Sequence, residues 1–546
     1  MITVARRYAD LVAAFAWAVP EEFNFGALVD AWATDRSRVA LYWEDETGHT
    51  ARLTFWDVKQ STNRMMNALA GLGVARGDPV MVMLPRVPAW QTAIVGALKL
   101  GALVIPCTAS LRAKDIAYRA RHSGAKAIVT LLEQVPEVET ALAEVPGSPL
   151  RIALGGAPAG WHDLDAVLAD ASSGGVPART RSDEPALCFY TSGTTKEPKA
   201  VLHAHGYTFA HRWTGEYWLD LQRTDLHWTT SDTGWAKAAY GVLFGPWMNG
   251  VPVFMYDGRF DPERELDLLA RYEVSVFCAP PTEYRLLVKQ DVKRRHLPRL
   301  RHCTGAGEPL NPEVIHAWHD ALGLLIHDGY GQTETILLAA NVPGLPIRPG
   351  SMGKPFPGHD LRVIDEAGRE LPPGEVGDLA LRGSPPSLFR EYWKNPEETA
   401  ACRRGEWYVT GDRASRDADG YLWFVGRADD VIISAGYRIG PFEVESALLE
   451  HPAVVESAVV ASPDPVRGEI VKAFVVLRPG HAPGDALVRE LQEHVKRVTA
   501  PYKYPRAIEF VAGLPKTVSG KIRRVELRER ERRKGGRAAG AGTADI

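Results

Sequence analysis

The sequence predicts an α/β protein in two parts: a large N-terminal domain of layered α/β sheets with a β-rich subdomain, and a small α+β C-terminal domain. Three observations lead to this prediction. Apolar strands alternate with helices from residue 54 onward, helical signals fade between residues 350 and 426, and a new α/β unit begins after residue 426. At 546 residues the chain exceeds what one hydrophobic core usually supports. We therefore expect domains at 1–428 and 429–530 and a disordered tail at 531–546.

The first elements alternate regularly between helix and strand, and each ends at glycine or proline. Residues 93–107 form the longest apolar stretch, but Lys99 interrupts it and it is shorter than the ~18 apolar residues of a membrane span. It therefore predicts a buried helix followed by a buried strand. The expected helices are 55–72, 88–100 and 112–122, and the expected strands are 79–84, 103–107 and 126–131.

The same rhythm returns further along the chain. Short apolar strands over 186–190, 274–278 and 324–327 each lead into a polar or glycine-rich loop. Loops at the carboxyl ends of such strands are where open α/β sheets bind ligands. The β-rich part is expected to hold strands 361–365 and 378–382. The last unit is expected to hold strands 430–433, 454–461 and 469–477 and helices 441–450 and 485–498.

The charge balance argues against a nucleic-acid-binding protein. Hydrophobic residues make up 45% of the chain, and 64 basic against 67 acidic side chains leave a net charge of −3. Five cysteines without a CxxC pair predict reduced thiols rather than disulfides or a zinc site. The N-terminus lacks a cleavage pattern after an apolar core, so we expect a cytoplasmic protein and disfavour the mitochondrial matrix. Monomer and homodimer both stay open.

The first segment with chemical content follows the strand at 186–190. It combines hydroxyls, backbone amides and two lysines in one loop, a composition that suits a polyphosphate. The loop is not a Walker motif, because no GxxxxGK[ST] occurs and Ala200 follows its second lysine. A polar surface loop is the simpler alternative. The segment contains Thr191, Ser192, Gly193, Thr194, Thr195, Lys196, Glu197, Pro198 and Lys199.

Four further segments carry polar residues in loops. The second, 328–335, places an aromatic residue between glycines and a carboxylate at Glu334 that can hold Mg²⁺ together with phosphate oxygens. The third, 407–412, ends at Asp412, and the fourth spans 426–440. Acids in such loops can bind ribose hydroxyls, and arginines can pair with phosphate. The fifth, 515–522, contains Lys521, and a single loop lysine is usually a solvated surface charge.

In this order, the five segments resemble the adenylate-forming superfamily of acyl-CoA synthetases, adenylation domains and luciferases, over nearly the whole chain. Residues 426–445, 462–469 and 499–506 are most similar to the medium-chain acyl-CoA synthetases. Two positions depart from the superfamily pattern, which commonly has glycine where this chain has Lys196 and Ala200. These two positions bear on the flexibility of the phosphate loop and on the rate of adenylation.

The resemblance implies a ligase that uses ATP, Mg²⁺ and coenzyme A to convert a carboxylic acid first to its acyl-adenylate and then to its thioester. Lys521, Thr333 and Glu334 are expected to act in catalysis, with Glu334 also at the metal. Residues 191–199 are expected at the phosphates of ATP. The remaining nucleotide contacts are expected from Gly307, Glu308, Pro309, Asp328, Gly329, Tyr330, Gly331, Gln332, Asp412 and Arg427.

The resemblance also implies that the C-terminal domain rotates between the two half-reactions, about a hinge matched by Asp429. The expected coenzyme A contacts are Ala435, Gly436, Tyr437, Arg438, Arg467, Tyr504 and Arg506, for which a scattered basic surface is the alternative. Acetyl-CoA synthetases show tryptophan where this chain has Gly331, which suggests an open acyl pocket with Trp235 in its wall. A medium-chain fatty acid or a compact aromatic acid is therefore expected.

Other functions on the same scaffold were weighed. A peptide-synthetase module would be followed by a carrier domain, and only a charged tail follows Lys521, although a separate carrier protein stays open. Nothing demands the oxygen chemistry of a luciferase, and intact Lys521, Asp412 and Glu334 argue against a non-catalytic metabolite sensor. His203 and His205 lie beside the phosphate loop, but a pair without further ligands is more often structural than metal-binding.

Overall fold

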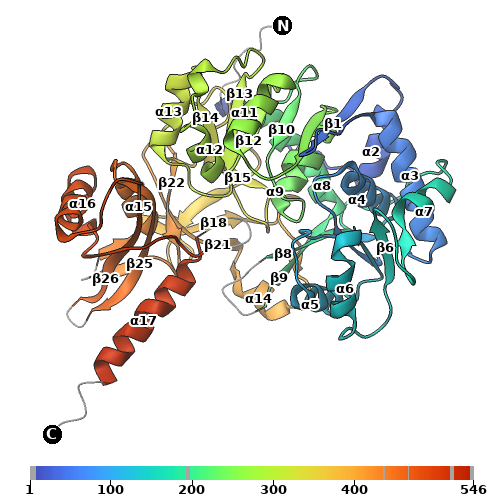
Figure 1. Cartoon of the computed structure of the whole chain (residues 1–546). Coiled ribbons are helices and arrows are strands. Elements are labelled where there is room, and N and C mark those ends of the chain that lie inside the picture. The colour runs from blue at the N-terminus through green and yellow to red at the C-terminus, as the bar shows by residue number, and fades with distance from the viewer. Residues whose placement is uncertain (1–7, 192–196, 435–436, 465–466, 517–521, 541–546) are drawn as a thin grey trace.

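The computed structural model describes residues 8–191, 197–434, 437–464, 467–516 and 522–540. Over these residues the strands form four sheets. The first three belong to one large lobe, and the fourth belongs to a smaller lobe at the carboxyl end of the chain (Figure 1). Among the described residues, none of the helices combines the length and the apolar character needed to cross a membrane.

The first sheet contains eight strands in the order β19-β9-β8-β4-β3-β5-β6-β7, and its central strands run parallel. Strands β3 and β4 are buried on both faces and read as continuous apolar runs, as parallel strands covered by helices do. The strands are β3 (Pro79–Met83), β4 (Leu103–Pro106), β5 (Ala127–Leu131), β6 (Leu150–Leu154), β7 (His162–Asp163), β8 (Pro185–Thr191), β9 (Lys199–Ala204) and β19 (Glu391–Tyr392).

The second sheet contains nine strands in the order β16-β15-β14-β13-β12-β10-β11-β1-β2. From β14 to β1 the strands are parallel, so their carboxyl ends meet at one edge. The strands are β1 (Val39–Asp45), β2 (Thr50–Thr54), β10 (His227–Thr229), β11 (Val253–Asp257), β12 (Val276–Ala279), β13 (His302–Ala306), β14 (Ile326–Gly331), β15 (Leu337–Ala340) and β16 (Lys354–Pro355).

Helices cover both sheets, and one apolar core joins them, with Val80 and Val104 of the first sheet and Val253 and Val276 of the second in the same cluster. The helices of this lobe are α1 (Tyr8–Ala14), α2 (Phe25–Trp32), α3 (Phe55–Gly71), α4 (Pro88–Leu100), α5 (Ala113–Ser123), α6 (Val135–Leu142), α7 (Leu164–Asp170), α8 (His205–Trp213), α9 (Ala236–Ala238), α10 (Gly245–Met248), α11 (Pro262–Arg271), α12 (Pro281–Leu287), α13 (Pro312–Leu322) and α14 (Pro396–Ala401). Two π-helical segments, η2 (Thr214–Trp218) and η3 (Ala239–Phe244), and short 3₁₀ turns complete it.

Local sequence explains where these helices begin and end. Thr54 and Asp57 form a capping box at the start of α3, so two otherwise unpaired backbone N–H groups are satisfied. Pro88 opens α4 and Gly101, with φ of 78°, closes it. These are the boundaries expected from the sequence, and residues 93–107 are the buried helix and strand that were predicted.

The third and fourth sheets each contain five strands. The third, the predicted β-rich subdomain, consists of β17 (Leu361–Ile364), β18 (Val376–Arg382), β20 (Arg403–Arg404), β21 (Trp407–Arg416) and β22 (Leu422–Arg427). The fourth consists of β23 (Ile432–Ser434), β24 (Tyr437–Ile439), β25 (Val454–Asp464), β26 (Gly468–Leu477) and β27 (Ala507–Phe510). The small lobe adds α15 (Pro441–Leu449), α16 (Asp485–Val498) and α17 (Arg524–Gly540).

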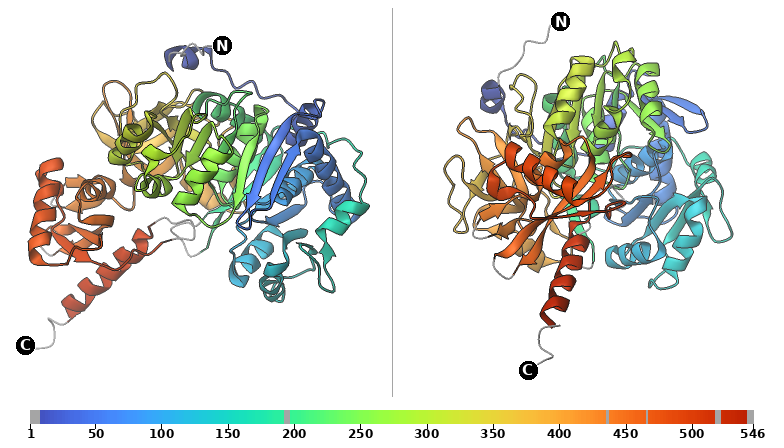
Figure 2. Two further views of the ribbon diagram at one scale, coloured as in Figure 1. Left: turned by 45° about the horizontal axis from the view of Figure 1, so that its top comes forward. Right: turned by 60° about the vertical axis from the view of Figure 1, so that its left-hand side comes forward.

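One boundary corrects the sequence prediction. A disordered tail was expected from residue 531, but α17 continues to Gly540, and residues 541–546 lie outside the described part. Glu531 is buried and pairs with Lys472 at 2.8 Å, and Ser462 donates to it at 2.9 Å. The charged sequence predicted disorder, whereas this ion pair and this hydrogen bond hold the helix against β25 and β26. Helix α17 then extends away from the rest of the lobe (Figure 2).

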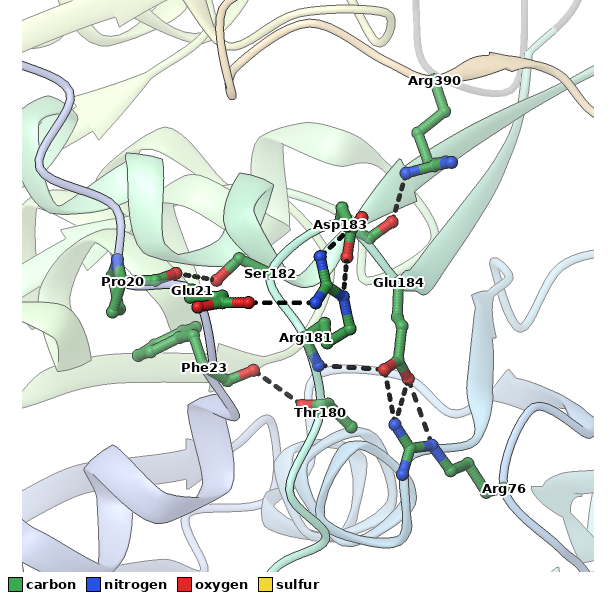
Figure 3. A network of polar contacts seen from close by, with 10 residues as sticks. All are labelled: Pro20, Glu21, Phe23, Arg76, Thr180, Arg181, Ser182, Asp183, Glu184 and Arg390. Carbon is green, nitrogen blue, oxygen red and sulfur yellow. Dashed lines mark hydrogen bonds and ion pairs between the residues drawn. The ribbon is translucent and has the colours of Figure 1, made fainter.

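Strand β8, which leads into the phosphate loop, is anchored at its start by a polar network (Figure 3). Ser182 donates to the Pro20 carbonyl at 2.5 Å, and Arg181 donates to the Glu21 carboxylate at 3.0 Å. These bonds connect the chain before α2 to the residues that precede β8. Glu184 pairs with Arg76, and the guanidinium of Arg390 donates to the Asp183 carbonyl. The start of β8 is therefore held by elements far apart in the sequence.

Candidate functional site

Asp412 is the centre of a buried hydrogen-bond network in which three of the predicted segments meet. Its Oδ2 accepts from the Tyr330 hydroxyl at 2.5 Å and from Gln332 Nε2 at 2.8 Å, and its Oδ1 accepts from Arg427 Nη1 at 3.1 Å. Tyr330 and Gln332 come from the end of β14, Asp412 from β21 and Arg427 from β22. The fold thus brings Tyr330 to the Asp412 carboxylate, although the two residues are 82 positions apart in the chain.

The pairing of β21 with β22 accounts for part of this geometry, because Asp412 and Arg427 stand opposite each other in the register. Two residues that were not singled out from the sequence complete the network. Tyr408 donates to Gln332 Oε1 at 2.9 Å, and the Thr410 carbonyl accepts from Gln332 Nε2 at 2.9 Å. Both belong to the segment 407–412, so their nearness to Asp412 in the sequence was the sign by which they could have been identified.

Burial governs the electrostatics of this network. Loss of solvent raises the pKa of Asp412, and the neighbouring Arg427 charge opposes that rise. Asp328 lies at the centre of β14 and is 7% exposed, and burial raises its pKa to about 8. Burial likewise raises the pKa of Tyr330, so its hydroxyl stays protonated and donates to Asp412. The site therefore presents the Asp412 carboxyl group with hydrogen-bond donors arranged around it.

Thr333 and Glu334 are held from two sides. His203 Nε2 donates to the Thr333 carbonyl at 2.7 Å. Burial lowers the pKa of His203 to about 3, so its ring is neutral and carries its one proton on Nε2. The Tyr392 hydroxyl donates to Glu334 Oε1 at 2.8 Å, and the Phe389 N–H donates to the Glu334 carbonyl at 2.7 Å. A hydroxyl and a carboxylate on one short segment are oxygen ligands of the kind Mg²⁺ prefers.

This donor set fits a magnesium ion that is held partly by the protein and partly by phosphate oxygens. Within the described ranges, no three His, Cys, Asp or Glu side chains gather as a metal cage. His203 is committed to Thr333, and both ring nitrogens of the buried His205 lack a hydrogen-bond partner among the described residues. Of this histidine pair, His203 thus fixes the backbone at Thr333.

The phosphate loop is described only at its two ends. Lys199 Nζ pairs with Glu398 at 2.5 Å and lies 4.9 Å from the centre of the Tyr392 ring, so this lysine is engaged with α14 and β19 rather than free for a phosphate. Tyr118 donates to the Pro198 carbonyl at 3.1 Å. Ser192, Gly193, Thr194, Thr195 and Lys196 lie outside the described residues, whereas Thr191 and Glu197 flank them.

The segment formed by Gly307, Glu308 and Pro309 follows β13, next to β14, where Ala306 pairs with Gly329. Glu308 accepts from Thr282 Oγ1 at 2.9 and 2.8 Å and pairs with Arg285 at 3.3 Å. Gly307 has φ of 106° with open space where a Cβ would stand. The loop therefore lies beside the Asp328–Gly329–Tyr330 segment, as a shared nucleotide-binding edge requires.

A small apolar cavity of about 10 Å³ lies between the first sheet, α4 and η3. Trp235 and the π-helical segment η3 are part of its wall, and π-helical turns occur often at functional sites. The loop before Trp235 packs tightly, since a Cβ on Gly234 would stand 2.1 Å from the Thr108 backbone nitrogen. The lining residues are Trp90, Ile94, Pro106, Leu187, Phe189, Thr233, Trp235, Ala239, Leu243 and Phe244.

Gly331 is not among these lining residues, and its backbone has a requirement of its own. A Cβ there would stand 2.4 Å from the Ile336 carbonyl oxygen, at the irregular pairing of β14 with β15. Replacement by tryptophan would therefore disturb this turn as well as any pocket nearby. The close approach of the Ile336 carbonyl is thus a structural reason for glycine at position 331, in addition to the open acyl pocket inferred from the sequence.

The described residues predicted to contact coenzyme A all belong to the small lobe. Tyr437 is 52% exposed, and its ring stacks on Tyr502 with centres 4.4 Å apart. Arg506 Nη1 donates to the Tyr504 hydroxyl at 2.7 Å. The exposed Tyr502 was missed in the sequence because nothing marks it apart from its neighbours in 499–506.

Three further predictions concern the junction of the lobes and the residues around it. Asp429 lies between β22 and β23, 3.9 Å from Arg427 and 3.6 Å from Arg528 in ion pairs. Arg467 follows the β25 strand, where its N–H donates to Asp464 at 2.8 Å. Lys521, Ala435 and Gly436, together with the Arg438 side chain, lie outside what the structure describes.

Residues 28–393 match the family model of the AMP-binding enzymes, and residues 443–521 match that of the AMP-binding enzyme C-terminal domain. The chain is 45% identical to the mitochondrial acyl-coenzyme A synthetase ACSM3 of Mus musculus, over 94% of this chain and 91% of that protein. It is 46% identical to the uncharacterized acyl-CoA ligase YtcI of Bacillus subtilis, over 94% and 97%.

A solved structure gives the same picture. The chain is similar to the anthranilate CoA ligase AuaEII in complex with anthranoyl-AMP, with a TM-score of 0.89 and 32% sequence identity. The match covers 96% of this chain and 100% of that one. The similarity therefore extends over both lobes.

Proposed function

Because the chain belongs to the AMP-binding enzyme family and to its acyl-CoA synthetases, we propose that it is an ATP-dependent acyl-CoA ligase acting in two half-reactions. In the first, a carboxylic acid and ATP give an acyl-adenylate and pyrophosphate. In the second, the thiol of coenzyme A takes the acyl group and AMP leaves. The observation that carries the proposal is the Asp412 network, which joins three of the five segments on which the resemblance rests.

In the first half-reaction, a carboxylate oxygen bonds to the α-phosphorus while the bond from that phosphorus to pyrophosphate breaks. The barrier comes largely from bringing two anions together and from charge on the phosphoryl oxygens, so a fixed cation lowers it. We assign that cation to Lys521. We assign the ribose hydroxyls to Asp412, and Arg427, which donates to its Oδ1, would hold the carboxylate in position.

Magnesium belongs to this step, and Thr333 and Glu334 are the residues that would hold it. When bound, it supplies positive charge that compensates the phosphate oxygens. The contribution of the protein is to fix its oxygen ligands. The Tyr392 hydroxyl orients the Glu334 carboxylate, and His203 fixes the backbone at Thr333.

In the second half-reaction, the thiol sulfur bonds to the acyl carbonyl carbon, the bond from that carbon to the phosphate oxygen breaks, and the thiol proton passes to solvent. One rigid site cannot present both Lys521 and a path for the thiol. We propose that the small lobe rotates about Asp429 and brings the segment 435–438 to the site, with Tyr437, Arg467, Tyr504 and Arg506 toward the coenzyme A nucleotide.

We propose a medium-chain fatty acid or a compact aromatic acid as the substrate, and the apolar side chains around Trp235 support this choice. AuaEII, similar over both lobes, carries an aromatic acyl-adenylate in its solved complex. A cytoplasmic location also stays a proposal, since one relative is named mitochondrial and another is bacterial.

A panel of acids tests the substrate class. Pyrophosphate release is measured with even-numbered acids from acetate to dodecanoate and with benzoate, at fixed ATP and coenzyme A. The highest kcat/KM is expected for a medium-chain acid or for benzoate, because their apolar parts gain about 0.8 kcal/mol per buried methylene. If acetate gave the highest turnover, the proposed substrate class would be wrong, but the assignment as an acyl-CoA ligase would be unaffected.

A further inference from the structure

A second cleft lies at the edge of the nine-stranded sheet opposite the candidate site. Its volume is about 520 Å³, within the range of small-molecule sites. The residues that line it precede or begin strands β1, β10, β11, β12 and β13, whereas the candidate site follows the carboxyl ends of β13 and β14. The charged residues of its lining are Arg38, Arg223, Asp225, Arg271, Glu273 and Arg299.

Four arginines converge on this cleft, and three of them have no ion pair among the described residues. Arg223 and Arg299 are exposed, and neither has a hydrogen bond to any described group. Arg38 is partly buried, and its pKa is lowered by burial and by the charge of Arg223. The charge of Asp35 opposes this lowering at Arg38, whereas Arg223 and Arg299 form no ion pair with a described residue, so part of the positive charge of the cleft is uncompensated.

Arg38 is held rigidly in this position. Its Nε and Nη2 both donate to the Gly250 carbonyl, at 3.0 and 2.6 Å, and its guanidinium stacks on Trp32 at 4.2 Å. Gly250 has φ of 62°, and a Cβ there would stand 2.5 Å from Arg38 Nη2. Two of the five guanidinium N–H bonds are thus used for placement and three remain for a ligand. Such fixing lowers the entropy cost of binding.

The acidic residues of the cleft do not cancel this charge. Asp225 is committed to Arg301 at 2.5 Å and accepts from Ser275 at 2.9 Å. Arg271, the fourth arginine, pairs with the buried Glu44 at 3.1 Å. Glu273 is the one cleft carboxylate without an ion pair among the described residues. The three unpaired arginines outnumber it, so the cleft attracts an anion.

We propose that this cleft is a binding site for a small phosphorylated molecule, separate from the site where acyl-CoA is made. Arginine binds phosphate through paired N–H bonds, which a guanidinium plane matches better than an ammonium does. The volume exceeds the need of inorganic phosphate alone, so the ligand carries a polyphosphate or a phosphorylated nucleoside. A nucleoside polyphosphate and the 3′-phosphorylated ADP end of coenzyme A share this chemistry.

The proposal is tested by calorimetric titration of the full chain with its active site filled by a non-hydrolysable acyl-sulfamoyl adenosine. Inorganic tripolyphosphate and 3′,5′-ADP are titrated separately, so the two sources of phosphate are distinguished. We expect one binding site per chain for at least one of them. In the variant Arg223→Glu/Arg299→Glu its affinity should fall at least tenfold, and it should also weaken with added salt. Arg489→Glu, an exposed arginine on α16, is the matched control and should bind as the unmodified chain does.

Failure of both probes to bind the unmodified chain with its active site filled would overturn the proposal. Equal affinity in the unmodified chain and the double variant would overturn it as well. Acyl-CoA formation is measured in the same variant and should be retained, because both arginines lie at the edge of the sheet opposite the candidate site. Failure of the phosphate-site proposal can therefore be distinguished from an error in the ligase assignment, because each is read from a different measurement.

Discussion

Asp412 is a buried carboxyl group that accepts from the Tyr330 hydroxyl, the Gln332 amide and the Arg427 guanidinium. Burial raises its pKa, and the arginine and the hydrogen bonds oppose that rise. A group with this arrangement is suited to receive ribose hydroxyls without reorganising. Removing the charge while keeping the shape should therefore show what the network does.

We expect Asp412→Asn to raise the KM for ATP about 10- to 100-fold, because a hydrogen bond to a charged group contributes about 1.5–3 kcal/mol. Initial rates of pyrophosphate release at varied ATP measure this. Asp419→Asn, at an exposed aspartate paired with Arg348, is the control and should leave KM unchanged. An unchanged KM in Asp412→Asn would remove the ribose role from this residue.

His211 gives a pH-dependent prediction at the same scale. It is fully buried between Tyr207 and Phe244, neither ring nitrogen has a partner among the described residues, and burial lowers its pKa to about 3. The unfolded chain takes up this proton below about pH 6.5 and the folded chain does not, so stability is lost as pH falls.

The variant His211→Phe should lose less stability in acid. Between pH 7 and pH 5, its free energy of unfolding should gain about 2 kcal/mol relative to the unmodified chain, since each pH unit below the unfolded pKa contributes about 1.4 kcal/mol. Urea unfolding at the two pH values measures this. A difference that is the same at both would show that His211 does not titrate on unfolding.

At the scale of elements, Lys99 joins three helices inside the large lobe. Its Nζ donates to Asp30 Oδ1 on α2 and to Asn63 Oδ1 on α3, each at 2.6 Å, while Lys99 itself lies on α4 with its side chain 0% exposed. Burial lowers the pKa of Lys99 and Asp30 opposes that shift. From the sequence, the same residue appeared only as an interruption of an apolar stretch.

We expect Lys99→Met to destabilise the fold by about 3–5 kcal/mol, because it leaves the Asp30 charge without its buried partner. Lys114→Met, at an exposed position of α5, is the control and should change the unfolding free energy by less than about 0.5 kcal/mol. Urea unfolding at neutral pH compares the two. Equal stability of both variants would mean that the ion pair does not tie the helices together.

The elements that follow from sequence are those with a local cause. Helix α4 has proline at its start and a left-handed glycine at its end, and β3 and β4 are continuous apolar runs. Short strands such as β7 and β19 exist only because a neighbouring strand pairs with them, so no local pattern announces them. The same holds for Lys199 with Glu398 and for His203 with the Thr333 carbonyl, which are contacts between distant segments.

At the scale of the whole molecule, described residues of the two lobes contact each other beside β22 and α13. Asn311 donates to Ser446 at 2.9 Å, and Gly440 packs so closely on β22 that a Cβ would stand 2.1 Å from the Val425 carbonyl oxygen. Small interfaces of this kind permit relative motion. The proposed rotation requires the backbone at Asp429 to change, and this residue lies in the short connection between β22 and β23.

Asp429→Pro should separate the half-reactions, because proline fixes φ near about −65°. We expect thioester formation from acyl-adenylate to slow at least tenfold, with adenylation changed less than threefold. Asp429→Ala removes the ion pair with Arg528 but leaves the backbone free, so it should support both steps. Equal loss in the two variants would assign the effect to the ion pair and remove the hinge from Asp429.

The most direct test of the central claim is Lys521→Ala measured in both half-reactions. Adenylation is followed by pyrophosphate release with acid and ATP alone, and thioester formation by acyl-CoA production from preformed acyl-adenylate. The proposed mechanism predicts that adenylation falls by at least a hundredfold, since removal of one stabilising charge costs about 2.7–4 kcal/mol, and that acyl transfer to coenzyme A is largely retained. Equal loss in both half-reactions, or no loss in either, would contradict it.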